Sequence, residues 1–398
     1  MAAITAARQG ATVTIFETHE RIGRKLLATG NGCCNLTNTN AGALHYHGDS
    51  PEFVNFAFSQ LSTTGTIAFF HDLGLCTIVE DSGKVYPRTA QGSNVLDLLR
   101  IELMRLQVTI KTETRISSII RDGDLWGLKT DKGGKSSSES FDKVIVACGG
   151  KSASNLGGTD SGLNLLTALG HSVVPAYPVL VPLKTVNQFN KQLKGVKVQA
   201  ALSLIVDGKQ VGSESGELLF MEYGISGMPT IRISNLAGKA LNKSQSVEIS
   251  IDIMPDFSDE QLNIELNCRI TKRPNVTIEN QLLGLIHKRL IVPVIQSACL
   301  DKNSHLDKNE VPVLIKYLKS WRMPVSGWLS WIDAQAMAGG ISTAEINGQT
   351  MESLIAPGIY ICGELIDITG DCGGYNLQWA WSSGYVAGFS ASSISSIC

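Results

Sequence analysis

The chain has 398 residues, an apolar content of 43% and a formal net charge of -2. This length predicts two or three domains, and the near-zero charge argues against a nucleic-acid partner or a polybasic membrane patch. The 9 Cys residues lack zinc-ligand spacing, and their odd number without a secretory leader predicts reduced thiols in a cytoplasmic protein. No uncharged apolar run approaches the roughly 20 residues that span a bilayer, so no membrane association is expected.

The first residues predict the second half of a dinucleotide-binding unit. A helix is expected over residues 2–9 and a strand over residues 12–16, with Glu17 at the end of the strand. An acid at this place binds the ribose hydroxyl pair in dinucleotide folds, about 20 residues after a G-x-G-x-x-G loop. Only 16 residues precede Glu17. Two explanations are open: the start of the chain is misplaced and a first strand is missing, or the chain is a shortened relative.

Residues 21–38 (RIGRKLLATGNGCCNLTN) combine basic side chains with a dense run of turn formers. The residues of interest are Arg24, Lys25, Gly30, Asn31 and Asn35. Cations next to turn amides are suited to hold a diphosphate. The alternative interpretation is a solvated loop beside a capped helix.

Helices are expected at 53–73 and 94–106, with a hairpin at 77–86 between them. His45, His47 and His71 are interpreted as surface or satisfied histidines, and no metal site is expected. Three β runs then follow, at residues 115–121, 125–130 and 141–147. The last of them leads into the turn that contains Gly149.

Residues 185–334 change character. Alternating strands are expected at 196–206, 217–220, 231–234 and 246–253, which together predict a small antiparallel barrel or sandwich. Helices are expected from residue 257 to about 321. The predicted domains are therefore 1–184 with 335–398, 185–255 with 319–334, and 256–318.

Residues 358–388 (GIYICGELIDITGDCGGYNLQWAWSSGYVAG) carry the strongest local pattern. A short apolar strand ends at Gly363, and Gly373 and Gly374 precede a helix whose small residues recur every three or four positions. Glycines let backbone amides approach a ligand, and the positive end of a helix dipole favours an anionic group. The alternative is an ordinary tight turn.

The chain resembles the bacterial FAD-dependent oxidoreductases of the aminoacetone-oxidase-like and 3-dehydro-bile-acid-reductase-like group. The matching segments are residues 23–38, 143–170, 216–228, 333–346 and 358–388. The resemblance implies an α/β fold: a discontinuous Rossmann-like FAD-binding domain with an inserted antiparallel β-domain and a helical domain. Two departures are Cys33, where the family often has Arg, and Ala336-Met337, where Val-Thr is usual.

The resemblance also implies how FAD is held. Glu17 would bind the adenosine ribose, and Ile116 and Gly149 would lie at the adenosine end. The residues along the rest of the cofactor would be Arg24, Lys25, Gly30, Asn31, Asn35, Gly363 and Glu364. The residues at the isoalloxazine would be Gly373, Gly374, Tyr375 and Asn376.

These patterns predict an FAD-dependent oxidoreductase that transfers a hydride between flavin and a small organic substrate. No Ser/His/Asp or Cys/His set suggests a protein nucleophile, so Tyr375 and Asn376 are only flavin-proximal candidates and the catalytic residues are unknown. NAD(P)H, as electron donor, would have to dock transiently, because no second glycine fingerprint is present. The alternative is a truncated or degenerate flavoprotein scaffold that acts as a binding module. Substrate, reaction direction and oligomeric state are left open.

Overall fold

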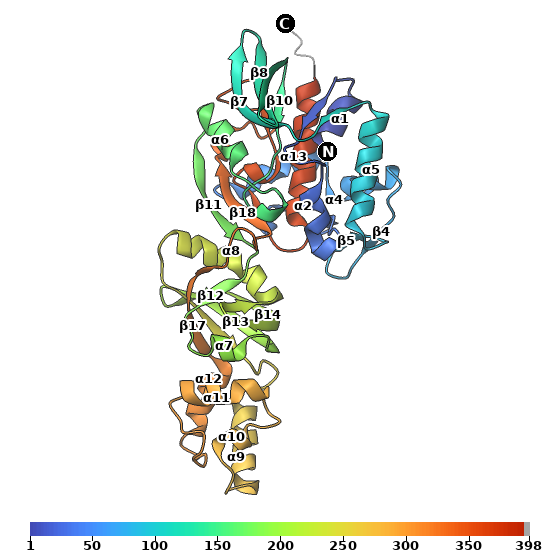
Figure 1. The fold of residues 1–398 in the computed structure, drawn as a ribbon. Helices are drawn as coiled ribbons and strands as arrows, with labels where there is room; N and C mark the ends of the chain where they lie inside the picture. The colour runs from blue at the N-terminus through green and yellow to red at the C-terminus, as the bar shows by residue number, and fades with distance from the viewer. Residues whose placement is uncertain (394–398) are drawn as a thin grey trace. The chain divides into compact units, whose positions relative to one another are not determined.

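The computed structural model describes residues 1–393 and divides the chain into two compact units (Figure 1). The first unit comprises Met1–Ala176 and the segment from Gln335 onward, and the second comprises Tyr177–Ala334. The discontinuous first unit encloses the second in sequence, as the predicted fold class requires. The second unit begins before the junction expected near residue 184, and it contains both the predicted β-domain and the predicted helical domain.

The first unit contains most of the short helices and one long helix. Its helices are α1 (Ala2–Arg8), α2 (Arg24–Ala28), α3 (Val54–Gln60), α4 (Thr63–Asp72), α5 (Gly92–Arg105), α6 (Ser161–Ala168) and α13 (Tyr375–Ser392). The single helix predicted over 53–73 is divided into α3 and α4. Ser62 causes the break, because its extended backbone ends α3 and its hydroxyl caps α4 by accepting from the Gly65 amide at 3.1 Å.

Two parallel strand pairs form the Rossmann-like part of this unit. β1 (Thr14–Phe16) pairs with β6 (Thr109–Lys111), and β10 (Val144–Val146) pairs with β19 (Ile359–Ile361). No strand among residues 1–393 hydrogen-bonds to both pairs, so they form two separate two-stranded sheets.

Antiparallel strands surround these pairs. Two of the three predicted β runs are confirmed as β7 (Arg115–Asp122) and β8 (Leu125–Lys132), but their third antiparallel strand is β9 (Lys135–Phe141), and the predicted run at 141–147 instead contains β10. The predicted hairpin is confirmed as β4 (Thr77–Val79) and β5 (Lys84–Pro87), with β2 (Thr37–Asn38) as its third strand. β3 (Tyr46–His47) pairs with β20 (Thr369–Gly370), and the remaining strands are β11 (Val173–Val179) and β18 (Ala336–Ile341).

Helix α13, red in Figure 1, is the central helix of the first unit. It packs against α1, α3 and the 3-10 turn η6 (Gly363–Leu365). Trp379 is 1% exposed and donates from its indole to the Gly363 carbonyl at 3.0 Å, while Trp381 donates to the Leu36 carbonyl at 2.9 Å. Buried hydrogen bonds thus hold Gly363 and the segment around Leu36 against the same helix.

The second unit is built on a closed antiparallel barrel. In barrel order its strands are β12 (Leu183–Thr185), β15 (Gly224–Ser226), β14 (Lys209–Met221), β13 (Lys197–Val206), β16 (Val247–Asp252) and β17 (Trp321–Trp328). Its helices are α7 (Asn190–Leu193), α8 (Met228–Asn242), α9 (Asp259–Lys272), α10 (Ile278–Gln281), α11 (Lys288–Ser297) and α12 (Val311–Lys319). One hydrophobic cluster includes barrel residues such as Leu202 and helical residues such as Leu314.

The strand predicted at residues 231–234 is wrong, because these residues belong to α8. Pro229 lies in the first turn of α8, where its missing amide hydrogen costs no hydrogen bond. Four residues of alternating polarity also fit one face of a helix, and the buried Ile233, Ala237 and Ala240 follow the helical spacing.

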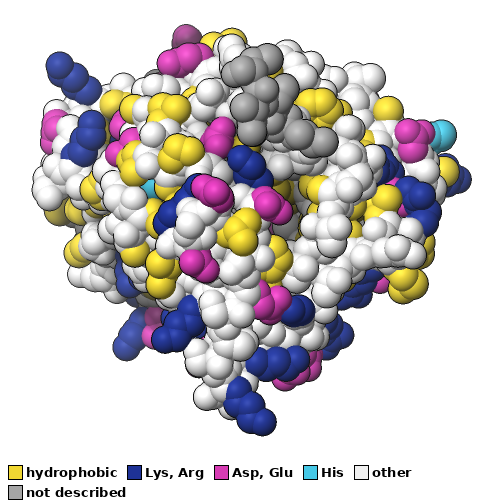
Figure 2. Space-filling view, turned by 90° about the horizontal axis from the view of Figure 1, so that it is seen from above, with side chains coloured by type: hydrophobic (Ala, Val, Ile, Leu, Met, Phe, Trp, Pro, Cys, Tyr) yellow, Lys and Arg dark blue, Asp and Glu magenta, His cyan; other side chains and the backbone are white. Residues whose placement is uncertain are grey.

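Lys and Arg side chains are interspersed with Asp and Glu on the face that Figure 2 shows. Across residues 1–393, none of the helices combines the length and the apolar character needed to cross a membrane.

The close approach of α13 to α1 gives a stability prediction. A Cβ at Gly388 would lie 2.3 Å from the Ala2 carbonyl oxygen, whereas one at Gly384 would meet its nearest atom at 3.4 Å. Gly388→Ala should therefore lower the free energy of unfolding by about 1–3 kcal/mol, as overpacking does. Gly384→Ala is the matched control and should be near neutral, because Ala favours the helix. Urea denaturation measures both, and equal effects of the two variants would contradict the packing.

Candidate functional site

The end of β1 brings the predicted ribose acid near the turn after β10. The Glu17 amide donates to the Lys111 carbonyl at 2.9 Å, and its carboxylate accepts from the His19 amide at 2.8 Å. His19, whose amide binds this carboxylate, also lies against the loop that follows the turn, close to Gly157.

Arg24 reaches the loop that follows this turn. Its Nη1 lies 2.7 Å from Nδ1 of His19, and its Nη2 donates to the Asn155 carbonyl at 3.3 Å. Gly157 in the same loop has a φ of 106°, and a Cβ there would lie 2.4 Å from Nε2 of His19. A cation thus stands beside a glycine loop, an arrangement that suits an anionic group.

Lys25 and Glu364, both predicted to lie along the cofactor, bind each other. Lys25 Nζ lies 2.5 Å from Glu364 Oε2 and 2.6 Å from the Ser152 hydroxyl. Glu364 also accepts from the Ser152 hydroxyl at 2.7 Å and from the amides of Gly150 and Met337 at 2.9 Å each. We call these five residues the carboxylate cluster. Each oxygen of Glu364 accepts two hydrogen bonds, so the carboxylate is fully used.

The charge of Glu364 is stabilised against its burial. Burial raises the pKa of its carboxyl group, but the positive charge of Lys25 and the hydrogen bonds from Lys25, Ser152 and Gly150 outweigh this effect and leave the pKa below its ordinary value. Gly149 lies close by, since a Cβ there would be 3.7 Å from Glu364 Oε2. Glu364 is therefore ionised and fixed at neutral pH.

The predicted turn at residues 30–35 lies against the start of α13. Gly30 and Asn31 both have left-handed backbones, with φ of 57° and 54°. A Cβ at Gly374 would lie 2.8 Å from Oδ1 of Asn35, and the Asn38 side chain donates to the Gly373 carbonyl at 3.0 Å. The two glycine-containing segments, far apart in sequence, are thus in direct contact.

Asn35 has an unused polar atom at this place. It is 8% exposed, and its Oδ1 is buried and accepts no hydrogen bond from any of residues 1–393. A buried acceptor without a donor costs free energy unless a ligand or water pairs with it. Asn35 is thus the clearest sign of a ligand position among the predicted residues.

The N-terminus of α13 offers donors to the same region. Gly374 precedes the helix with a φ of 97°, and no side chain of the described residues caps it. Asn376 instead folds back on Gly370, accepting from its amide and donating to its carbonyl at 2.8 Å each. Asn376 therefore fixes the preceding loop, and the first-turn amides have no side-chain cap within residues 1–393.

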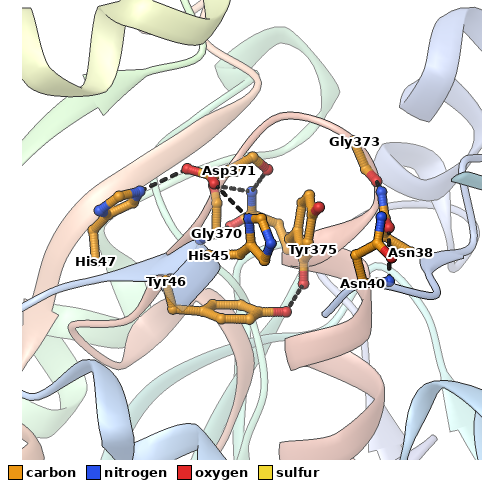
Figure 3. A network of polar contacts seen from close by, with 10 residues as sticks. Asn38, Asn40, His45, Tyr46, His47, Gly370, Asp371, Gly373 and Tyr375 are labelled. Carbon is orange, nitrogen blue, oxygen red and sulfur yellow. Dashed lines mark hydrogen bonds and ion pairs between the residues drawn. The ribbon is translucent and has the colours of Figure 1, made fainter. Parts of the chain in front are cut away.

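A group of four side chains, which we call the histidine cluster, lies beside this helix start (Figure 3). Its members are His45, His47, Asp371 and Tyr375. Nδ1 of His45 lies 3.0 Å from Asp371 Oδ2, and Nε2 of His47 lies 2.7 Å from Asp371 Oδ1. The rings of His45 and Tyr375 are stacked with centroids 4.6 Å apart. The sequence did not indicate this cluster, because His45 ends the 3-10 turn η2 (Ala43–His45), His47 lies in β3, and Asp371 is 326 residues away from His45 in the chain.

A second histidine network is buried. His171 is 3% exposed, and it lies 2.9 Å from Glu345 Oε2 and 2.8 Å from the Ser353 hydroxyl. Ser353 is 2% exposed and also accepts from two backbone amides. The order Ser, His, Glu resembles a nucleophilic triad, but substrate has no access to a serine buried to this degree. No sequence spacing indicated this network.

Ile116 and Gly363 are the remaining residues that were predicted to hold the cofactor. Ile116 lies in β7 opposite Thr130, and the Thr114 amide, two residues earlier, donates to the Glu17 carbonyl at 2.8 Å. Gly363 belongs to η6 with a φ of 71° and donates to the Ser383 hydroxyl at 3.0 Å. Within residues 1–393 no three His, Cys, Asp or Glu side chains are arranged to hold a metal ion.

The carboxylate cluster gives a pH prediction. Because the folded state lowers the pKa of Glu364, the ion pair stabilises the fold above the ordinary carboxyl range and this stabilisation is lost as pH falls through it. Lys25→Met should lower the free energy of unfolding at pH 7 by about 1–3 kcal/mol, the cost of leaving a buried charged group short of a partner. Urea denaturation between pH 3 and pH 8 is the measurement.

Two further variants control this prediction. Glu364→Gln should flatten the loss of stability at acid pH, since the titrating group is gone. Arg21→Met removes an exposed ion pair with Glu20 and should change stability by less than about 1 kcal/mol. If the free energy of unfolding fell at acid pH in Glu364→Gln as it does in the wild type, the role of the carboxylate would be contradicted.

Comparison with known proteins places this geometry in a family. The chain matches the HI0933-like protein Rossmann domain over residues 1–390. The 3-dehydro-bile acid delta(4,6)-reductase of Clostridium scindens is 36% identical, over 98% of this chain and 96% of the relative. A ribosomal RNA dihydrouridine synthase of Haemophilus influenzae is 29% identical, over 97% of this chain and 94% of the relative.

A solved structure of a 3-ketosteroid-delta4-(5alpha)-dehydrogenase from Rhodococcus jostii covers 99% of this chain and 94% of its own, with a TM-score of 0.48 and 14% identity. A likeness of this size carries no argument about function. The family match, by contrast, extends over nearly the whole chain, as does the identity to the Clostridium relative. The chain therefore belongs to the HI0933-like family of Rossmann-domain proteins.

Proposed function

We propose that the first unit binds FAD and that the chain is an oxidoreductase that transfers a hydride between this cofactor and a small organic substrate. The observation that carries the proposal is the start of α13. There, uncapped helix amides and the buried, unpaired Oδ1 of Asn35 meet in one place. Amide donors and a lone acceptor are the groups that the polar edge of a flavin ring requires.

The residues present fit such a cofactor. Glu17 ends a strand of a parallel pair and would bind the ribose, and Arg24 with the glycine loop at 155–157 would face the diphosphate. Asn35 and the α13 amides would hold the ring. FAD, when bound, supplies or accepts the hydride, and these side chains bind and orient it.

The resemblance implies that Glu364 and Lys25 contact FAD directly. We assign them a different role. All four acceptor positions of Glu364 are used within the carboxylate cluster. Glu364 would therefore position the loop after β10 and strand β18 instead of binding FAD itself. Lys25 would neutralise that carboxylate and stand next to the cofactor site.

The substrate class is inferred from the chemistry that two relatives' names share. One reduces a 3-dehydro-bile acid, and the other makes dihydrouridine. In both cases the product gains two hydrogens at a carbon–carbon double bond. We infer a substrate whose double bond is conjugated with a carbonyl group, and NAD(P)H as an external electron donor. No observation favours the alternative of a non-catalytic scaffold.

RNA is the second candidate substrate, because a relative with 29% identity is a ribosomal RNA dihydrouridine synthase. The net charge of -2 disfavours a nucleic-acid partner, and the one face that Figure 2 shows has interspersed charges instead of a basic patch. A steroid-like or other small enone is therefore preferred.

The first prediction concerns the cofactor. The purified chain, incubated with FAD and then desalted, should retain flavin absorbance and release FAD on denaturation. Asn35→Leu should weaken FAD binding at least tenfold, because it replaces the unpaired acceptor with an apolar group of similar size. Asn40→Leu is the control, because Asn40 is exposed and bonds to Asn38 through its backbone amide. A wild-type chain that retains no FAD would contradict the proposal.

The second prediction concerns the substrate. The dithionite-reduced holoprotein, mixed anaerobically with 4-androstene-3,17-dione or with a uridine-containing ribosomal RNA fragment, should regain oxidised flavin absorbance faster with the enone. Product mass should increase by two hydrogens. Reduction of the RNA alone would replace the preferred substrate with the second candidate.

A further inference from the structure

The histidine cluster lies at the start of α13 but takes no part in the carboxylate cluster. The side chains of His45, His47 and Asp371 are 37%, 38% and 41% exposed. They are therefore open to solvent and to a ligand, unlike His171, whose side chain is fully buried. A carboxylate that orients two accessible imidazoles beside a proposed redox site is an arrangement suited to proton transfer.

We propose that His45, oriented by Asp371, donates to the substrate the proton that accompanies hydride addition. The inference rests on the proposed function and deepens it. His45 is the catalytic residue, while Asp371 and His47 are positioning residues.

The hydrogen bond to Asp371 determines which nitrogen of His45 faces outward. Nδ1 is used by the carboxylate, and no hydrogen bond within residues 1–393 involves Nε2. The ring stacks on Tyr375 with an interplanar angle of 23°, and the Tyr46 hydroxyl donates to the Tyr375 carbonyl at 2.7 Å. The imidazole is thus held by its face and by one nitrogen, and Nε2 is free to carry the proton (Figure 3).

Asp371 remains ionised in this arrangement. Burial raises the pKa of its carboxyl group, but the hydrogen bonds from His47 and His45 outweigh burial and leave the pKa below its ordinary value. Each carboxylate oxygen engages one imidazole. A fixed negative charge therefore attracts the positive charge of protonated His45 and holds its ring in one orientation.

Other titratable groups face the cluster from the neighbouring elements. Burial and the charge of Asp371 raise the pKa of Tyr375, and burial followed by the charges of Tyr375 and Asp371 raises that of Tyr46, so both phenols stay neutral. The Asp367 carboxylate accepts from the Asp49 amide at 3.0 Å, and the Lys84 side chain lies near the glycine turn before α13.

The proton transfer balances the reduction. Addition of a hydride to one carbon of a conjugated double bond leaves an electron pair on the rest of the conjugated system. The Nε2–H bond of protonated His45 breaks, and this pair takes the proton to form a new C–H or O–H bond. His45 becomes neutral and regains a proton from solvent. The hydride comes from the reduced flavin of the proposed function, so the product carries two more hydrogens.

The test uses FAD-loaded protein with His45→Gln, His47→Gln and Asp371→Asn. His45→Gln should bind FAD and be reduced by dithionite like the wild type. Its reoxidation by 4-androstene-3,17-dione should be about 10²–10⁴-fold slower, the usual contribution of a general acid. The wild-type rate should fall as pH rises through the titration of one group, and this dependence should be absent in His45→Gln. His71→Gln, an exposed histidine on α4, is the matched control and should behave like the wild type.

A second readout is independent of turnover. NMR of ¹⁵N-labelled histidine rings, recorded at pH 9 and assigned with the His45→Gln variant, should show His45 as one tautomer with its proton on Nδ1 in the wild type and as a mixture of tautomers in Asp371→Asn. His47→Gln should slow reoxidation less than tenfold. A wild-type rate and pH profile in His45→Gln, or an unchanged His45 tautomer in Asp371→Asn, would overturn the inference. A wild-type protein that binds no FAD or reduces no enone contradicts the proposed function itself, and the inference fails with it.

Discussion

A single carboxylate, whose side chain is 19% exposed, determines where the residues around the proposed cofactor site lie. Glu364 accepts hydrogen bonds from Lys25 on α2, from Gly150 and Ser152 after β10, and from Met337 on β18. Because an ionised carboxylate is stable inside a protein only when its lone pairs are used, these segments cannot separate without a large desolvation cost. Arg24 and Gly149, each next to a member of the cluster, are positioned by the same contacts. The site therefore depends on one charge more than on any local turn.

Local patterns in the sequence predicted those elements that short-range chemistry decides. The hairpin at 77–86, the strands at 115–121 and 125–130 and the helix after Gly374 are of this kind. The strand predicted at residues 231–234 was wrong because four alternating residues fit a strand and a helix equally well. Only the longer pattern, up to Asn242, distinguishes the helix from a strand. Strand composition also does not reveal which strands hydrogen-bond to each other, and in the structure the two parallel pairs share no strand.

For the site, the sequence identified residue types but not partners. Lys25 and Glu364 were both singled out, yet nothing in a chain of this length indicates that they bind each other. The same holds for His45 and Asp371, which tertiary folding alone brings together. Burial is equally hidden: His171 and His45 each contact a carboxylate, but the side chain of His171 is fully buried while that of His45 is 37% exposed. Accessibility, which separates a structural histidine from a candidate proton donor, is a property of the fold.

The carboxylate and histidine clusters are joined by a short backbone path. The Met337 amide donates to Glu364, and the Met337 carbonyl accepts from the Thr369 hydroxyl at 2.8 Å. Thr369 lies in β20, directly opposite His47 in β3. A hydride and a proton must reach neighbouring atoms of one substrate, so their sources have to be held at a constant separation. Because Met337 acts here through its backbone, the path does not depend on its side chain, and the departure from the usual Val-Thr leaves it intact.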